Sequence, residues 1–170
     1  MSGPTLDDRR TAAAVGSVST RAAGAADERF LAELFGAVRR PALQAAGLDG
    51  SALEQLVELQ RRGQQLSYAA AHPDADEQVI LVDGQPVGRL VTAVTGDVLE
   101  VLDLAVVPER QGGGVGRAVL AACQARVAAT GSGRVRLAVA VGNPAARLYA
   151  RLGFVVCATS PTDRVMEWRP

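Results

Sequence analysis

Apolar residues in the first part of the chain recur at helical spacing in two segments. The first segment predicts an amphipathic helix that Asp27 caps and that Pro41 ends. Its apolar side consists of Phe30, Leu31, Leu34, Phe35 and Val38. The second segment predicts a helix that begins at Ser51, with Glu54 in a capping-box position. Gly63 is expected to end or weaken this second helix.

The other apolar stretches of the N-terminal two thirds are short and bounded by turn residues, as is typical of strands. Four strands are predicted, at residues 15–22, 79–82, 87–94 and 98–107. Asp83 and Gly84 form a turn sequence between the second and third of them, and Gly96 and Asp97 form another before the fourth. The last three strands are therefore expected to form an antiparallel meander.

Helical spacing resumes at Val115 and is expected to stop near Gly131. Asn143 and Pro144 then begin a short helix, which Gly153 ends. The strands predicted in this part of the chain are residues 134–141, 154–158 and 164–168. The first of these is almost wholly apolar, so we expect it to be central and buried on both faces, whereas the last two form a closing hairpin.

The resulting order of elements is β-α-α-β-β-β-α-β-α-β-β. No internal repeat or linker divides it, so one α/β domain with a mixed sheet is predicted for residues 15–170. Residues 1–14 are poor in bulky apolar side chains and rich in charge, which predicts a disordered leader.

Composition excludes several classes of protein. The 170 residues carry 18 basic and 18 acidic side chains, so the formal net charge is zero and no nucleic-acid partner is expected. No apolar run is long enough to cross a bilayer, which predicts a cytoplasmic protein without a membrane partner. Cys123 and Cys157 have no metal-ligand spacing and the chain has one His, so we expect reduced core thiols and no metal site.

A glycine-rich loop, residues 112–116, lies between the strand that ends near Val107 and the helix that follows. Backbone amides at such a helix start can converge on phosphate oxygens, which predicts an anion site. Two common phosphate motifs are excluded, because Gly116 is followed by Arg117 and Ala118. A P-loop needs Lys and Ser or Thr at those positions, and the dinucleotide fingerprint needs glycine where Arg117 stands.

The spacing that remains is Gln-x-x-Gly-x-Gly, carried by Gln111, Gly114 and Gly116. It resembles the acetyl-coenzyme A signature of the GCN5-related N-acetyltransferase (GNAT) family. A second family pattern follows, in which Asn143 precedes a short helix with Tyr149 and then Gly153 and Phe154. The resemblance covers residues 15–168 and implies the acyl-CoA N-acyltransferase fold, a mixed and mostly antiparallel sheet with helices on both faces.

The resemblance also implies which residues contact acetyl-coenzyme A. The loop would hold the pyrophosphate through Gln111, Gly112, Gly113, Gly114, Val115 and Gly116. The pantetheine arm would pair with the backbone of Leu104, Ala105 and Val106, and one of the first two amides would stabilise the oxyanion. Asn143 would contact the arm from the far side, or would serve only as a helix cap. Arg110 and Arg117 flank the loop and are candidates for phosphate contacts.

Acetyl transfer to an amine requires a proton acceptor for the amine and a proton donor for the thiolate that leaves. By resemblance Tyr149 is the donor, since a phenol is protonated at neutral pH. Glu100 is the candidate base, and Asp103 is the alternative on the opposite face of the strand unless a bulge intervenes. Another base position used in the family is occupied here by Ala138.

The sequence therefore predicts an acetyl-coenzyme A-dependent N-acetyltransferase that acts by direct attack in a ternary complex. Its partner would be an amine-bearing small molecule or protein, with Gln60, Arg61 and Tyr68 near the acceptor entrance by analogy of fold. The alternative is a coenzyme A-binding module without turnover. Pairing through the C-terminal strands, which the resemblance implies, predicts a homodimer.

Overall fold

A computed structural model describes residues 16–170, so the predicted leader lies outside the described residues. The elements are β1 (Val18–Ala22), α1 (Glu28–Ala45), α2 (Gly50–Ala71), β2 (Asp76–Val82), β3 (Gln85–Thr95), β4 (Val98–Val106), α3 (Val115–Ala128), β5 (Arg134–Ala140), α4 (Ala145–Arg151), β6 (Val155–Thr159) and β7 (Asp163–Trp168). Short 3-10 turns precede α1 (η1, Ala25–Asp27) and follow β4 (η2, Pro108–Arg110). The predicted order of strands and helices is confirmed.

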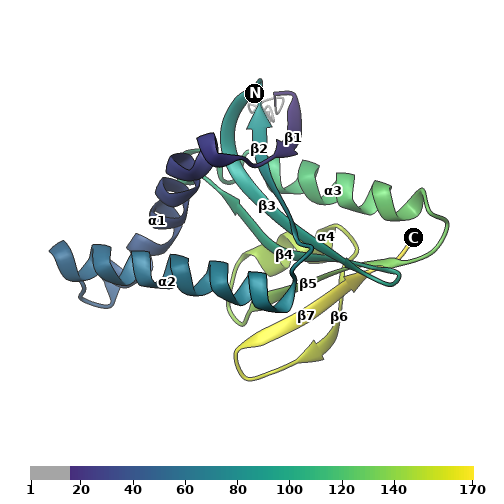
Figure 1. Cartoon of the computed structure of the whole chain (residues 1–170). Helices are drawn as coiled ribbons and strands as arrows, with labels where there is room; N and C mark the ends of the chain where they lie inside the picture. Colours follow the sequence, from purple (N-terminus) through teal and green to yellow (C-terminus); the bar gives the residue numbers. More distant parts are fainter. Residues whose placement is uncertain (1–15) are drawn as a thin grey trace, which may run out of the picture.

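The seven strands form one twisted sheet in the order β1-β2-β3-β4-β5-β7-β6 (Figure 1). Every neighbouring pair is antiparallel except β4 and β5, which run parallel. The parallel pair needs a crossover connection, and α3 provides it. The predicted α/β class with a mixed, mostly antiparallel sheet is confirmed.

One face of the sheet packs against α3 and α4 in a continuous apolar core. Ile80, Leu120 and Val135 are completely buried in it. Val115, Val119, Cys123 and Val127 place four further α3 side chains in the same core, as their spacing of three or four residues requires. Cys123 is therefore a buried thiol as expected, but Cys157 is exposed on β6, the strand at the edge of the sheet.

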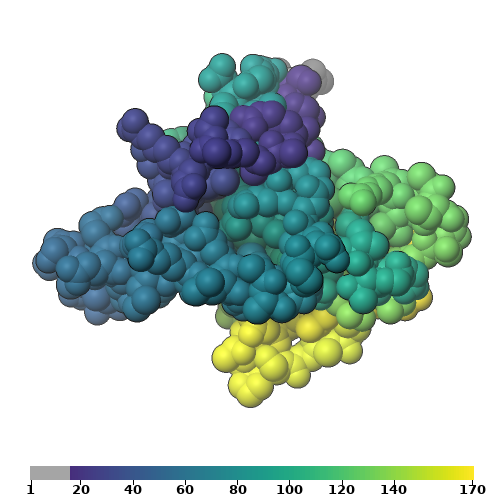
Figure 2. Space-filling model, in the orientation of Figure 1, coloured from purple at the N-terminus to yellow at the C-terminus, as the bar shows by residue number. Residues whose placement is uncertain are grey.

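The opposite face is covered by α1, which packs on β3, β4 and α2 (Figure 1). Leu34 of α1 and Leu53 and Val57 of α2 are buried on this side. In the space-filling view (Figure 2), part of the teal sheet remains visible between purple α1 and blue α2. Helices on both faces are thus confirmed, with a more open cover on the α1 side.

Both N-terminal helices are longer than the sequence predicts. Pro41 lies inside α1 and Gly63 lies inside α2, so neither residue ends its helix. The capping box at Ser51 is also wrong, because α2 begins at Gly50 and the Glu54 carboxylate instead binds the Arg40 guanidinium. Packing between α1 and α2 and this cross-helix ion pair outweigh the local breaking signals.

The prediction that β5 is buried on both faces is wrong. The strand is central in the sheet, but Val135, Leu137 and Val139 alone are buried, and Ala138 and Ala140 on the other face are exposed. The physical reason is that α1 packs on β3 and β4, so this face of β5 has no helix over it. Small apolar residues here leave an open strand surface next to β4.

Among residues 16–170, no helix has the length and apolar character needed to cross a membrane. The same residues contain no group of His, Cys, Asp and Glu side chains that could hold a metal ion.

Candidate active site

The parallel strands β4 and β5 separate halfway along their length. Their pairing runs only from Val98 to Val101 on β4. Beyond Val101, β4 continues to pair with β3 as far as Val106, while β5 continues to pair with β7 as far as Ala140. The second half of β4 therefore has no strand partner on its β5 side, which leaves backbone groups there for another molecule.

A β-bulge in β4 decides which carboxylates share a face. Val91 of β3 pairs with Asp103, and the next residue, Thr92, pairs with Val101, so Leu102 is the extra residue. Glu100 pairs with Ala93, which lies two residues after Val91 and hence on the same face of β3. Glu100 and Asp103 therefore lie on one face, the face covered by α1, although strict alternation separates them.

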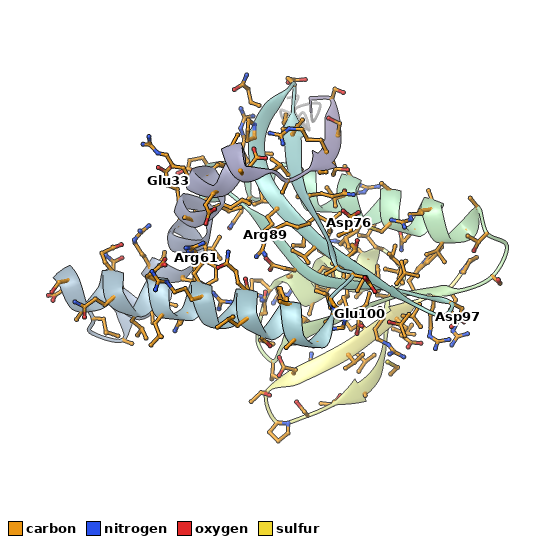
Figure 3. The ribbon with its side chains drawn as sticks, in the orientation of Figure 1. Glu33, Arg61, Asp76, Arg89, Asp97 and Glu100 are labelled. Atoms are coloured by element: carbon orange, nitrogen blue, oxygen red, sulfur yellow. The ribbon has the colours of Figure 1, made fainter. Side chains whose placement is uncertain are left out.

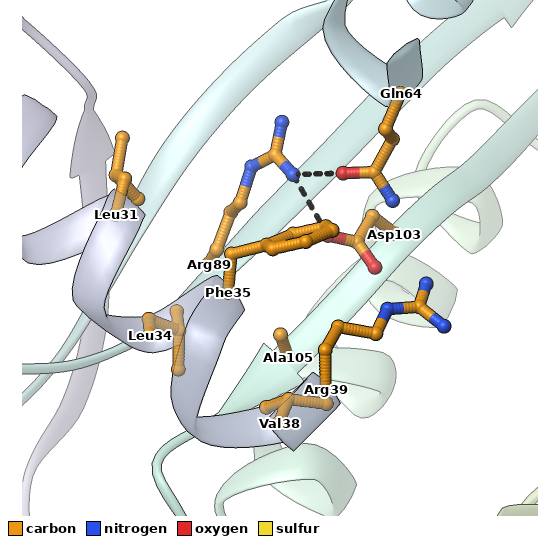
Figure 4. A pocket seen from close by; sticks show the side chains of 9 residues that line it. All are labelled: Leu31, Leu34, Phe35, Val38, Arg39, Gln64, Arg89, Asp103 and Ala105. Carbon is orange, nitrogen blue, oxygen red and sulfur yellow. Dashed lines mark hydrogen bonds and ion pairs between the residues drawn. The ribbon is translucent and has the colours of Figure 1, made fainter. Parts of the chain in front are cut away.

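Asp103 is held by a partly buried network of polar side chains around Arg89 (Figure 4). Its Oδ2 accepts a hydrogen bond of 3.0 Å from the guanidinium of Arg89, whose residue is only 9% exposed. Arg89 also donates to Gln64 of α2 at 2.8 Å and to Glu77 of β2. Burial raises the pKa of Asp103 above its usual value, although the charges of Arg89 and Arg39 oppose the rise.

Glu100 has a different environment. Its register partner on β5 is Arg136, which forms an ion pair with Glu167 at 2.7 Å. In Figure 3, Glu100 lies well away from both Arg89 and α1, toward the other end of the sheet. Glu100 does not line the cavity that Asp103 lines. Of the two carboxylates, Asp103 is therefore the one that lines this cavity.

Tyr149 lies on α4, half-buried against the core beside Phe154, with 6.1 Å between the two ring centroids. Its hydroxyl has no hydrogen-bond partner among residues 16–170, in contrast to that of Tyr68, which donates to the Leu102 carbonyl at 3.0 Å. Burial and then the nearby charge of Asp103 raise the pKa of Tyr149. A phenol in this state stays protonated at neutral pH and is free to donate.

The glycine-rich loop leads directly into α3. Gly114 is the N-cap residue in the left-handed conformation, with φ of 88°, which favours glycine. The Gln111 side chain donates to the Val106 carbonyl at 2.9 Å and so ties the loop to the end of β4. Within the described chain, Gly113 donates to the Arg110 carbonyl, whereas the amides of Gly112 and Gly114 have no acceptor.

Gly116 marks the point where three elements meet. A Cβ at this position would lie 3.5 Å from Leu148 of α4 and 3.9 Å from Leu104 of β4. The start of α3, the separated part of β4 and α4 are therefore close together. The glycine loop and Tyr149 border the same end of β4 as a result.

The three β4 residues that are predicted to contact the pantetheine arm, and Asn143, differ in their surroundings. Leu104 packs its side chain against the core, whereas Ala105 lines the cavity with Asp103. The Val106 carbonyl is already engaged by Gln111. Asn143 is exposed, and its side-chain oxygen accepts a hydrogen bond of 2.9 Å from the Ala145 amide, as a helix cap does.

Sequence reasoning did not find the residues of α1, α2 and β3 that surround Asp103. Phe35, Arg39, Gln64 and Arg89 all line the cavity. None of them belongs to a short motif, and Phe35 reads only as part of an apolar helix face. The predicted acceptor-side residue Arg61 instead lines a separate hollow, which Glu28 and Glu77 also line.

Comparison with known proteins places this arrangement in a class. Residues 73–156, which contain both sequence motifs, match the family model of the acetyltransferase (GNAT) domain. No curated protein matches the sequence.

Solved structures with the same fold cover nearly the whole chain. The PaiA N-acetyltransferase of Thermoplasma acidophilum, in complex with coenzyme A, is 20% identical with a TM-score of 0.68 over 91% of this chain and 99% of that one. An acetyltransferase of Thermus thermophilus is 22% identical, with a TM-score of 0.65 over 92% and 99% of the two chains. The ribosomal-protein-S18-alanine N-acetyltransferase of Escherichia coli is 19% identical, with a TM-score of 0.60 over 90% and 94%.

At these identities the structures show that the fold is shared. In this chain the shared fold includes the separated strand pair β4 and β5 and the glycine loop before the crossover helix α3. Residues 73–156 match the acetyltransferase domain of the GNAT family, and the resemblance found in the sequence is confirmed.

Proposed function

We propose that this protein is an N-acetyltransferase that transfers the acetyl group of acetyl-coenzyme A directly to an amine in a ternary complex. The observation that carries the proposal is geometric: α4, which carries Tyr149, and the glycine loop both border the half of β4 that β5 leaves unpaired, and Asp103 lies in that half. A proton donor and a proton acceptor are the two groups that the reaction requires.

The residues of the loop fit a phosphate-bearing cosubstrate. The amides of Gly112 and Gly114 have no acceptor in the described structure, and a Cβ at Gly112 would meet nothing within 4 Å. Arg110 and Arg117 form no ion pair within residues 16–170, so both guanidinium groups are free to contact phosphate. We propose that the loop from Gln111 to Gly116 holds the pyrophosphate of acetyl-coenzyme A.

The separated half of β4 fits the pantetheine arm. Leu104 lies past the point where β5 stops pairing, so its backbone groups on the β5 side can bind the arm. Those of Ala105 point to β3, because the Val107 amide donates to the Val87 carbonyl and alternate residues of a strand share an edge. The Val106 carbonyl is engaged by Gln111, so we expect Val106 to contribute through its amide or through packing. Asn143 supports this side of the site by capping α4, which carries Tyr149.

The proton transfers are assigned as follows. Asp103 takes one proton from the acceptor ammonium, and the resulting neutral amine forms the new C–N bond to the acetyl carbon as the C–S bond breaks. Tyr149 gives its phenolic proton to the departing thiolate and is reprotonated by the second proton that the nitrogen loses. The net products are the amide, free coenzyme A and one proton.

Asp103 is better placed than Glu100 for the first of these transfers. Its second oxygen, Oδ1, has no partner among the described residues, and its raised pKa makes it a stronger base than an ordinary carboxylate. Glu100 remains the alternative predicted from the sequence, because the bulge puts it on the same face.

The first experiment is calorimetric titration with acetyl-coenzyme A, with ATP and NAD as controls, followed by a thiol-release assay on a panel of amines. We expect acetyl-coenzyme A alone to bind and at least one amine to release coenzyme A. Binding without turnover of any amine would favour the non-catalytic coenzyme A-binding module. Absence of binding would refute the proposal.

A further inference from the structure

The cavity between α1 and β4, here called the α1–β4 cavity, combines an apolar wall with charged groups (Figure 4). Leu31, Leu34, Phe35 and Val38 of α1 form the apolar wall. Asp103 and Ala105 lie on the β4 side, so the cavity borders the strand that is proposed to hold the cosubstrate. It is open to solvent at Val38 and Arg39, which are exposed, so an acceptor can approach Asp103 from this side.

Arg89 does not contribute a free charge to this cavity. Its guanidinium is bonded to two carboxylates, those of Glu77 and Asp103, and to the Gln64 amide oxygen. Because only 11% of its side chain is exposed, it has little surface left for a ligand. Its role is to hold Asp103 in place rather than to bind an anion.

Arg39 is an exposed residue that also lines the cavity, and it forms no ion pair with a carboxylate among residues 16–170. Its guanidinium carbon lies 5.4 Å from the centre of the Phe35 ring, a cation–π contact with another residue that lines the cavity. Figure 4 shows the Arg39 guanidinium on the same side of the cavity as the Asp103 carboxylate. Its charge also reaches Asp103, since it lowers the pKa that burial raises.

We infer that the α1–β4 cavity binds a small zwitterionic acceptor, an amine with a carboxylate a few bonds away, as in an amino acid. The ammonium group lies at the free Oδ1 of Asp103 and the carboxylate at the guanidinium of Arg39. The remaining body of the acceptor packs on Phe35 and the apolar side of α1. This inference rests on the proposed acetyltransferase function and names its substrate class.

The pattern of charge argues against other amines. A linear polyamine places a second cation beside Arg39, which already supplies one, and like charges repel each other. An amine without any carboxylate leaves Arg39 without a partner. A zwitterion pairs with both the Asp103 carboxylate and the Arg39 guanidinium, and it adds no net charge to the cavity.

The test compares matched acceptors that differ only in the carboxylate: L-phenylalanine, its primary amide and phenethylamine, with spermidine as the dication. We expect kcat/KM from thiol release to be at least about tenfold higher for the amino acid than for its amide at matched amine protonation. Other L-amino acids are run beside it, so that side-chain fit is not mistaken for absence of carboxylate recognition.

Arg39→Gln is the decisive variant, with Arg29→Gln as its control on the same helix, where Arg29 is exposed and paired with Glu33. Arg39→Gln should raise KM for the amino acids by about tenfold, and its effect on the amide should be much smaller. Arg29→Gln should leave the preference for the carboxylate intact. Equal losses for acid and amide, or a preference for spermidine or phenethylamine, would overturn the inference.

Direct binding separates this inference from the function on which it rests. Calorimetric titration of the amino acids into protein saturated with coenzyme A should show binding that Arg39→Gln weakens, whether or not acetyl transfer occurs. Turnover of amines without carboxylate preference would overturn the zwitterion alone. Amino-acid binding without turnover would overturn the acetyltransferase alone.

Discussion

α3 and α1 pack on opposite faces of the same sheet, but they cover different kinds of side chain. Beneath α3, the core is apolar and continuous from Ile80 on β2 to Met166 on β7. On the face under α1, Leu34 and Val91 are buried, but the buried Arg89 forms ion pairs with two partly exposed carboxylates, those of Glu77 and Asp103. α3 closes its face of the sheet, whereas α1 leaves a cavity beside β4.

This difference indicates that the α3 face of the sheet stabilises the fold, whereas the α1 face carries the proposed chemistry. Dry apolar burial is the main source of folding free energy, and the α3 face supplies most of it. Buried charges cost desolvation and are weak evidence for stability, so the network around Asp103 is better explained by a functional role. Variants on the two faces should therefore have different phenotypes.

The largest expected effect on stability comes from the α3 face. Leu120→Ala removes a side chain with 0% exposure from the centre of the core. It should lower the free energy of unfolding by about 3 to 4 kcal/mol, because the cavity cannot fully collapse. The control Leu66→Ala, at a position that is 72% exposed on α2, should change it by less than about 0.5 kcal/mol. Urea denaturation followed by circular dichroism measures both, and similar losses would contradict the comparison.

The next effect concerns the loop that joins the core helix to the site. Gly114→Glu puts a carboxylate where the pyrophosphate is proposed to bind and should weaken acetyl-coenzyme A binding by about 100-fold or more. Gly114→Ala is the control, because it introduces a Cβ at the same φ of 88° without the charge. Titration calorimetry decides, and equal affinity for the two variants would show that the loop does not hold phosphate.

Tyr149→Phe tests the proton donor. It removes a hydroxyl that has no partner in the described chain, so folding should be nearly unaffected. Turnover should fall by about 100-fold while acetyl-coenzyme A affinity stays the same. Tyr68→Phe, which loses the hydrogen bond to the Leu102 carbonyl, is the control and should reduce turnover by less than about tenfold. Full activity of Tyr149→Phe would remove this residue from the mechanism.

A smaller and pH-dependent effect distinguishes the two carboxylates on the α1 face. Because burial raises the Asp103 pKa, Asp103 takes up its proton at a higher pH than an ordinary Asp, and activity should start to fall there as pH decreases. Asp103→Asn should lower kcat/KM by at least about tenfold and abolish that acid limb. Glu100→Gln should retain the limb in a pH profile. The reverse result would restore Glu100 as the base.

Local signals in the sequence were sufficient for most of the fold. Alternation, turn pairs such as Asp83 and Gly84, and the spacing of Val115, Val119 and Cys123 identified the strands and α3. The failures at Pro41 and Gly63 have one cause. A proline or glycine lowers the local stability of a helix, but packing between α1 and α2 compensates for that loss.

The residues of the candidate site also form two groups, those that a local sequence pattern identifies and those that no local pattern identifies. Gln111, the loop glycines and Tyr149 were found because they lie in short patterns with fixed spacing. Arg39, Gln64 and Arg89 come from three elements that are distant in sequence, and no local pattern connects them.

By itself, the sequence determined the order of elements, the glycine loop and the family motifs, because each depends on neighbours within a few residues. Only the tertiary structure decided that Leu102 is a bulge residue, so that Asp103 turns to the α1 face with Glu100. It also decided that Arg89 is neutralised by Glu77 and Asp103 while Arg39 stays free of carboxylates in the described structure. Register between strands and pairing between distant charges depend on how the whole chain packs, which no short window contains.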